Sequence, residues 1–332
     1  MLILDEVHRI KNPLSLASQA VRAISGGIKF KALLTGTPVE NELKDLWTLF
    51  DVFDSSHFGH LRRFAQEFMT ATIDHDRLRD KASNYILRRS KKDYLSDLPP
   101  RFEIVKDIEM ESDEERIFRD FLSSSLHPLK LLLLARKFSL HKALVEKTSY
   151  SSIENFLSCF SKTRQLVEIL EQIKDKNEKV IIFVTVRLAQ DLLRESLEDY
   201  FGVSIGIING DNNSQDKLTQ TLNDFKNKAG FGIIILSTLA AGVGLTITEA
   251  NHVIHYERWW NASKEDQASD RVYRIGQEKE VFVYYINLVS KKMTTFDRAL
   301  HELIQKKREM SGFLKPVGDI SDQEMLDRLG FK

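Results

Sequence analysis

Residues 236–277 read LSTLAAGVGLTITEANHVIHYERWWNASKEDQASDRVYRIGQ, and they carry most of what the sequence says about this protein. Ser237 and Thr238 follow an apolar, β-branched run, and Gly242 and Gly244 come shortly after them. Hydroxyl groups and glycine backbone at the end of a strand are suited to binding phosphate. The start of this stretch therefore predicts a strand that ends in a phosphate-binding loop.

The end of the same stretch places three polar side chains at helical spacing. Gln267, Arg271 and Arg274 are four and three residues apart, which would put them on one face of a helix. Two arginines alone on a helix are usually solvated surface groups. Two arginines and a glutamine that follow a strand, a phosphate loop and a second strand favour a functional site instead.

Apolar runs on both sides of this stretch indicate the fold class. Helical patterns separate most of five such runs, which cover residues 180–185, 204–209, 232–237, 253–256 and 281–288. Strands that are apolar on both faces and alternate with helices form parallel sheets covered on both sides. The sequence therefore predicts an α/β fold.

The first eight residues, MLILDEVH, form a short strand followed by Asp5 and Glu6. Taken alone, such an acidic pair is most often a solvated strand end, because short motifs match by chance. In the functional interpretation, Asp5 holds a magnesium ion through water and Glu6 orients and deprotonates the attacking water. His8 would couple this site to neighbouring elements.

A second polar motif, Thr35-Gly36-Thr37-Pro38, follows the next predicted strand, residues 30–34. A helix cap with a tight turn would explain it adequately. However, consecutive parallel strands end at the same carboxyl edge of a sheet, which is where ligands bind. We therefore expect this motif to lie beside Asp5 and Glu6.

The composition describes an ordinary globular chain with room for about two domains. Its 48 basic and 48 acidic residues cancel, so any phosphate-binding surface must be local. A single cysteine, Cys159, excludes an internal disulfide and a multi-cysteine zinc site, which suits a reducing cytoplasm. No apolar run approaches the roughly 20 residues that span a bilayer. We expect a cytoplasmic location and no membrane contact.

Taken together, the motifs resemble those of the Snf2 family of superfamily 2 helicase-like ATPases, in its bacterial form, over nearly the whole chain. DEVH resembles the second family motif and LTGTP, residues 34–38, the third. KVIIFVT, residues 179–185, resembles the fourth, STLAAGVGLTIT the fifth and DQASDRVYRIGQ the sixth. LRRSKKDYLSDLPP, residues 87–100, resembles the segment that leads out of the family's helical protrusion.

This resemblance implies two RecA-like lobes that close on ATP and step along double-stranded DNA, with ATP and Mg²⁺ as cofactors and Asp5 at the metal. Arg271 and Arg274 would be arginine fingers, completing a catalytic set with Asp5, Glu6 and His8. The implied nucleotide contacts are Thr35, Gly36, Thr37, Gly242, Gly244 and Gln267. The implied DNA contacts are Ser237, Thr238, Trp260, Asn261, Arg88 and Arg89, although for the last two a solvated face is an equally good explanation.

The resemblance also implies a domain order. Residues 1–55 would form the C-terminal half of a truncated first RecA-like lobe, and residues 56–100 a helical protrusion. Residues 101–160 would be a helical linker region, residues 161–300 the complete second lobe, and residues 301–332 a helical extension.

The phosphate loop of the family is the clearest departure. None of the 15 glycines is followed by lysine, so GxxxxGK[ST] does not occur in these 332 residues. The family places this loop upstream of DEVH. We therefore expect the N-terminal half of the first lobe to be a required partner and the chain alone to be inactive. The alternative is a non-catalytic DNA- or protein-binding remnant. Three further departures, Leu239, Ala241 and Thr246, lie in the fifth motif.

Overall fold

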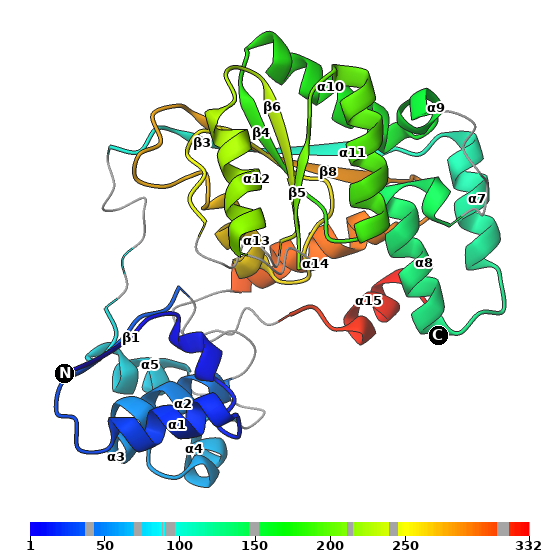
Figure 1. The fold of residues 1–332 in the computed structure, drawn as a ribbon. Coiled ribbons are helices and arrows are strands. Elements are labelled where there is room, and N and C mark those ends of the chain that lie inside the picture. Colours follow the sequence, from blue (N-terminus) through cyan, green and yellow to red (C-terminus); the bar gives the residue numbers. More distant parts are fainter. Residues whose placement is uncertain are drawn as a thin grey trace. The chain divides into compact units, whose positions relative to one another are not determined.

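The computed structural model describes residues 1–36, 43–69, 75–87, 89, 97–145, 153–210, 215–238, 245–310 and 319–331. The chain divides into two compact units (Figure 1). The first comprises Met1–Tyr94 with Gln305–Asp319, and the second comprises Leu95–Ile304 with Ile320–Lys332.

The second unit is built on a six-stranded parallel sheet with the order β3-β8-β7-β4-β6-β5. Its strands are β3 (Arg101–Glu109), β4 (Lys179–Phe183), β5 (Gly206–Ile208), β6 (Gly232–Leu236), β7 (His252–His255) and β8 (Val281–Val289). All five predicted strands are present, and the α/β fold class is confirmed.

Residues 101–160, expected to be a helical linker region, begin instead with strand β3. It pairs in parallel with β8, from Arg101 opposite Val281 to Glu109 opposite Val289. Its sequence, RFEIVKDIE, mixes charged and apolar residues, so it lacks the apolar run by which the other strands were found. An edge strand tolerates such charges because one side of it has no strand partner. The stacked rings of Phe102 and Phe282, with centroids 5.3 Å apart, fix its register.

Helices cover both faces of this sheet (Figure 1). Val180 and Ile182 of β4 point to one face, which is packed by α9 (Ile153–Ser158), α10 (Ser161–Asp175) and α11 (Arg187–Phe201). Ile181 and Phe183 point to the other face, which is packed by α12 (Gln215–Asn227) and α13 (Ala262–Ser269). The alternation of side chains along a strand produces these two apolar layers.

Four further helices complete this part of the chain: α7 (Ser112–Leu122), α8 (Pro128–Leu140), α14 (Phe296–Met310) and α15 (Asp322–Leu329). A short 3₁₀ helix, Lys142–Leu144, follows α8. Ser321 and Glu324 form a capping box at the start of α15, in which each side chain accepts from the other's backbone N–H. Helix α15 packs along α8.

In the first unit, β1 (Leu2–Leu4) pairs in parallel with β2 (Lys31–Leu33). A 3₁₀ helix (Val7–Ile10) and α1 (Leu16–Ser25) connect the two strands, and α2 (Leu43–Phe53) follows. This is the strand–helix–strand–helix order expected from the sequence. Buried Val7, Ile10, Leu49 and Val52 form the core between the strands and α2.

Three helices follow in this unit: α3 (Ser55–Phe58), α4 (Leu61–Phe68) and α5 (His75–Ser83). Their core is aromatic, since Phe58 packs edge-on against Phe50 and Phe64 with centroids 4.7 and 5.1 Å apart. Among the residues that the structure describes, no helix is both long enough and apolar enough to cross a membrane.

Candidate functional site

Asp5 and Glu6 lie at the carboxyl end of β1, as the sequence predicts. Glu6 has a φ of 50° and a ψ of 45°, in the left-handed region that residues other than glycine rarely adopt. Its backbone N–H donates to Oδ1 of Asp5 over 2.8 Å. This conformation costs of the order of 1–3 kcal/mol, and such strain is concentrated at functional sites.

His8 connects the acidic pair to the second polar motif. Its Nδ1 lies 3.2 Å from Oε2 of Glu6 and 3.4 Å from Oγ1 of Thr35. The backbone N–H of Val7 also donates to the carbonyl of Leu34 over 3.0 Å. The predicted proximity of the two motifs is therefore confirmed for Thr35. Gly36 follows as an exposed residue, and Thr37 lies outside the described residues.

The carboxylates of Asp5 and Glu6 suit a hard cation such as Mg²⁺. Magnesium in nucleotide sites is typically held by one or two carboxylates, with water and phosphate oxygens as its other ligands. Oδ1 of Asp5 accepts from Glu6, which leaves Oδ2 available. Within the described ranges, no three histidine, cysteine or acidic side chains are grouped to hold a metal by themselves. The residues fit an ion that arrives with its nucleotide.

In the second unit, the predicted helical face of Gln267, Arg271 and Arg274 is wrong. Helix α13 ends at Ser269, so only Gln267 lies on it, half-buried. Arg271 and Arg274 lie in a series of turns beyond the helix. The physical reason is a tertiary hydrogen bond: the carbonyl of Arg271 accepts from the backbone N–H of Ile247 over 2.9 Å.

Both arginines nevertheless point at the same segment. Nη1 of Arg271 lies 3.4 Å from the carbonyl oxygen of Leu245, and Nη1 of Arg274 donates to Oγ1 of Thr246 over 3.1 Å. Arg271 is buried, whereas Arg274 is exposed. Leu245 and Thr246 belong to the fifth motif, so the described end of that motif lies beside the sixth.

The remaining predicted residues are divided between described and undescribed parts of the chain. Ser237 and Thr238 follow β6 and are buried, each with 5% of its surface exposed. Arg89 is exposed. Gly242, Gly244 and Arg88 lie outside the described residues.

Trp260 and Asn261 have structural partners. The ring of Trp260 packs edge-on against Phe296, and the guanidinium of Arg136 lies 5.9 Å from its centroid. Asn261 is completely buried, and its side-chain oxygen caps α13 by accepting from the N–H of Lys264 over 3.2 Å. A direct DNA contact by Asn261 stays a prediction, and this burial does not favour it.

Sequence reasoning missed Glu257, which is 3% exposed. Its Oε1 accepts from Nε and Nη2 of Arg136, at 2.8 and 2.5 Å. Its Oε2 accepts from the backbone N–H groups of Thr185 and Val186, at the N-terminus of α11. One carboxylate therefore fastens α8 to the carboxyl edge of the sheet. The available signal was a charged pair, Glu257 and Arg258, directly after a predicted strand, because charges that become buried need partners.

Arg258, the other member of that pair, was missed as well. It is 1% exposed, and its Nε and Nη2 donate to Glu265 over 2.5 and 3.1 Å. Its Nη1 lies 2.5 Å from Nδ1 of His301, and its guanidinium stacks 4.3 Å from the ring centroid of Tyr285. These contacts hold α13 against the sheet and α14. They also hold the start of residues 270–277, the turns that carry Arg271 and Arg274, which we call the arginine turns.

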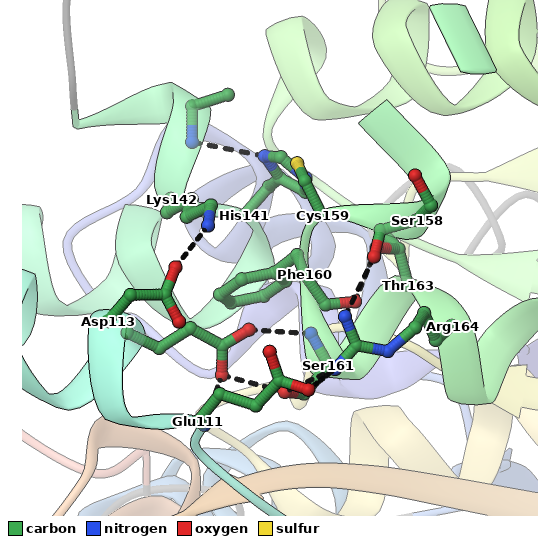
Figure 2. Close-up of polar contacts among 12 residues, drawn as sticks. Glu111, Asp113, His141, Lys142, Ser158, Cys159, Phe160, Ser161, Thr163 and Arg164 are labelled. Carbon is green, nitrogen blue, oxygen red and sulfur yellow. Dashed lines mark hydrogen bonds and ion pairs between the residues drawn. The ribbon is translucent and has the colours of Figure 1, made fainter. Parts of the chain in front are cut away.

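The lone cysteine lies near a histidine, but the pair is not a nucleophilic dyad (Figure 2). Sγ of Cys159 is 3.8 Å from Nε2 of His141, which is itself 2.9 Å from the carbonyl of Phe156. Nδ1 of His141 accepts from the N–H of Ala143. Burial lowers the pKa of His141 to about 3 and raises the pKa of the Cys159 thiol. Both side chains are therefore neutral near pH 7.

The surroundings of this pair are built from ion pairs and helix caps, as Figure 2 shows. Nζ of Lys142 donates to Oδ2 of Asp113 over 2.7 Å. Glu114, completely buried, accepts from both N–H and Oγ of Ser161 at the start of α10. The cluster joins α7 to α10, and its role is structural.

Comparison with known families agrees with this geometry. The model of the SNF2-related domain matches residues 1–181. The model of the helicase conserved C-terminal domain matches residues 161–276, which include the arginine turns.

Individual proteins match over most of the chain. The Zorya protein ZorD of Escherichia coli is 34% identical over 94% of this chain, which spans 31% of that protein. The ISWI chromatin-remodeling complex ATPase ISW1 of Saccharomyces cerevisiae is 27% identical over 91% of this chain, which spans 29% of that protein. The chain thus corresponds to about a third of the length of these relatives.

Solved structures match as well. The SWI2/SNF2 ATPase core of Sulfolobus solfataricus is 28% identical, with a TM-score of 0.51, and the match covers 93% of this chain and 65% of that one. The same core in complex with double-stranded DNA matches with a TM-score of 0.50 and 28% identity, over 93% of this chain and 67% of that one.

Proposed function

Because this chain belongs to the Snf2 family of helicase-like ATPases, we propose that it is part of a DNA-dependent ATPase that translocates on double-stranded DNA. The observation that carries the proposal is the contact of His8 with both Glu6 and Thr35. This contact links the polar ends of two adjacent parallel strands, at the sheet edge where α/β proteins bind ligands.

The acidic pair supplies the water chemistry in this proposal. The Asp5 carboxylate would help to hold Mg²⁺, which would supply positive charge to the phosphates of the substrate. The Glu6 carboxylate orients the attacking water and accepts its proton. The strained backbone of Glu6 and the His8 contact fix the direction of that carboxylate in advance, which lowers the reorganisation that the reaction requires.

Arg271 and Arg274 supply the positive charge. A guanidinium is always protonated and donates through a planar fork that fits phosphate oxygens. In the proposed reaction both arginines stabilise the charge that develops on the γ-phosphate, and Gln267 and Thr35 assist in nucleotide binding. The residues of the glycine loop, Gly242 and Gly244, would serve the same ligand.

Double-stranded DNA is the proposed partner. A structural relative from Sulfolobus solfataricus has been solved in complex with double-stranded DNA, which supports this choice. Of the DNA contacts that we expect from the sequence, Arg89 is exposed and Trp260 is half-buried, so both have surface that DNA could contact.

The test uses the restored protein, by which we mean these 332 residues preceded by a first-lobe segment that carries a GxxxxGK[ST] loop. Glu6→Gln keeps the size of the side chain and removes the base. DNA-stimulated ATP turnover should fall at least about 100-fold, the lower end of what general-base catalysis contributes. Duplex binding should be unchanged. Asp51→Asn, which removes a carboxylate paired with Arg22 on α1, is the matched control.

Wild-type restored protein that shows no DNA-stimulated turnover would refute the proposal. That result together with retained duplex binding would favour the binding remnant instead. Full activity of Glu6→Gln would show that another residue activates the water.

A further inference from the structure

Gln277 forms an unusual set of hydrogen bonds immediately after the arginine turns. Its side chain is 5% exposed. Nε2 lies within hydrogen-bond distance of three carbonyl oxygens, those of Ala250 at 2.8 Å, Thr248 at 3.1 Å and Val272 at 3.2 Å. Oε1 accepts from the N–H of Lys279 over 3.0 Å. Every hydrogen-bonding atom of this buried amide is in use.

The three carbonyls belong to two separate segments. Thr248 and Ala250 lie on the segment 245–250, which follows the glycine loop, and Val272 lies between the two arginines. The same two segments are joined by the arginine side chains, since Arg271 approaches the carbonyl of Leu245 and Arg274 donates to Thr246. The side-chain amide of Gln277 therefore joins the segment 245–250 to the turns that carry Arg271 and Arg274. Both guanidinium groups contact that same segment.

No helix performs this task, because α13 ends at Ser269. The chain from Arg271 to Gln277 is shaped by turns instead, including the hydrogen bond from the N–H of Gln277 to the carbonyl of Arg274 at 2.9 Å. Gly276 has a φ of +98°, a conformation that favours glycine. This backbone path returns Gln277 to hydrogen-bond distance of Val272 and Arg274, which precede it in the chain.

We propose that Gln277 is the positioning residue for Arg271 and Arg274: it sets their direction without touching nucleotide. The expected effect of Gln277 on ATP turnover rests on the proposed function. Its expected effect on the arginine turns does not. Without the amide, its two N–H groups no longer bridge the carbonyls of Thr248 and Ala250 to that of Val272, and the arginine turns can move away from the segment 245–250. A displacement of about 1 Å in a group that positions charge can cost about 100-fold in rate.

The structural consequence is tested on the 332-residue chain by hydrogen exchange. Gln277→Met keeps the length of the side chain and removes its hydrogen bonds. We expect amides in residues 245–250 and 271–277 to exchange at least about tenfold faster, while those of β4 and β7 are unchanged, as in local opening.

Gln190→Met is the matched control for this measurement. Gln190 is 1% exposed in the same unit, and its amide donates to the carbonyl of Val184 and accepts from Asn209. It should not alter exchange in residues 271–277. Unchanged exchange in Gln277→Met, or an equal increase throughout the second unit in both variants, would overturn the inference.

The kinetic consequence is tested in the restored protein. Gln277→Met should lower kcat by about 10- to 100-fold, with the KM for ATP and the Kd for duplex DNA each changed less than about twofold. In the Arg274→Ala background the same change should cost less than in the wild type, because the part of its effect that acts through Arg274 is already lost and only the part that acts through Arg271 remains. A purely structural role would instead lower kcat equally in both backgrounds.

The two proposals fail in different ways. A wild-type restored protein without DNA-stimulated turnover refutes the function, and the exchange experiment alone then decides whether Gln277 holds the arginine turns. Normal wild-type turnover with an additive effect of Gln277→Met refutes the positioning role and leaves the function intact.

Discussion

The guanidinium of Arg274 donates to the hydroxyl of Thr246 over 3.1 Å. Thr246 is one of three residues at which we expect the fifth motif to depart from the commoner sequence of its family. The threonine at this position therefore has a role in the structure, because its hydroxyl gives the exposed side chain of Arg274 a defined direction. Arg271 is directed by the neighbouring residue, Leu245, through its carbonyl.

We predict that the 332-residue chain alone does not hydrolyse ATP at a useful rate. It contains no Gly-Lys pair, and without the lysine and backbone amides of that loop the charge on the transferred phosphate is poorly neutralised. A steady-state assay with duplex DNA decides the matter. Turnover of about 1 s⁻¹ or more, which is ordinary for an enzyme, would show that other residues replace the loop.

We predict that Arg258→Met destabilises the second unit by about 3–5 kcal/mol, because it removes the guanidinium that pairs with the buried carboxylate of Glu265. Both side chains are essentially inaccessible, and they are 2.5 Å apart at their closest atoms. Urea denaturation measures the loss. The double variant Arg258→Met, Glu265→Gln should recover at least half of it, since neither charge of this pair then remains buried. A double variant as unstable as the single one would assign the cost to lost packing instead.

Stability should also depend on pH through His141. Burial lowers its pKa from 6.5 to about 3 in the folded protein. Between these values the unfolded chain binds a proton that the folded protein excludes, so the stability is fully present above about pH 6.5 and is lost as the pH falls toward 3. The steepest loss is about 1.4 kcal/mol per pH unit.

The measurement compares urea denaturation of wild type and His141→Gln between pH 4.5 and 7.5. Glutamine keeps a donor and an acceptor but does not titrate in this range. The variant should be the less stable protein at pH 7.5, because it loses the stacking of His141 on Phe156. Its disadvantage should shrink by about 3 kcal/mol at pH 4.5, two pH units below the unfolded pKa. Parallel stability curves would mean that His141 takes up its proton without unfolding.

Each strand of the sheet could be predicted only as far as its own sequence shows an apolar run. β4 and β6 are buried at every position, so an apolar run was enough to find them. β3 was missed because five of its nine residues are charged, and only pairing with β8 makes it a strand. Edge strands of this kind are defined by their partner more than by their own sequence.

The candidate site was predictable in its residues more than in its geometry. Spacing alone brought Arg271 and Arg274 together, but it assigned them to a helix that ends before both. A hydrogen bond from the distant Ile247 and another from the nearby Gln277, neither of which the spacing reveals, decide the turns instead. For Asn261, by contrast, the local sequence was informative, because an asparagine directly before a helix usually caps that helix, as Asn261 does for α13.

The account depends on the arginines most directly, and Arg274 is the better probe because it is exposed, whereas Arg271 is also part of the core. Arginine fingers contribute about 10³–10⁵ in rate, so Arg274→Ala should lower DNA-stimulated turnover of the restored protein at least about 100-fold. Arg274→Lys should not rescue it fully, since a point charge lacks the planar fork. Arg194→Ala removes another arginine, 37% exposed on α11, and should have no effect.

The decisive measurement is therefore DNA-stimulated ATP turnover and duplex affinity of wild type, Arg274→Ala and Arg194→Ala, determined on the same preparations of restored protein. The account predicts that only Arg274→Ala loses turnover and that all three bind duplex DNA equally in the absence of nucleotide. Near-normal turnover of Arg274→Ala, or a loss of turnover that follows a parallel loss of DNA binding, would contradict it.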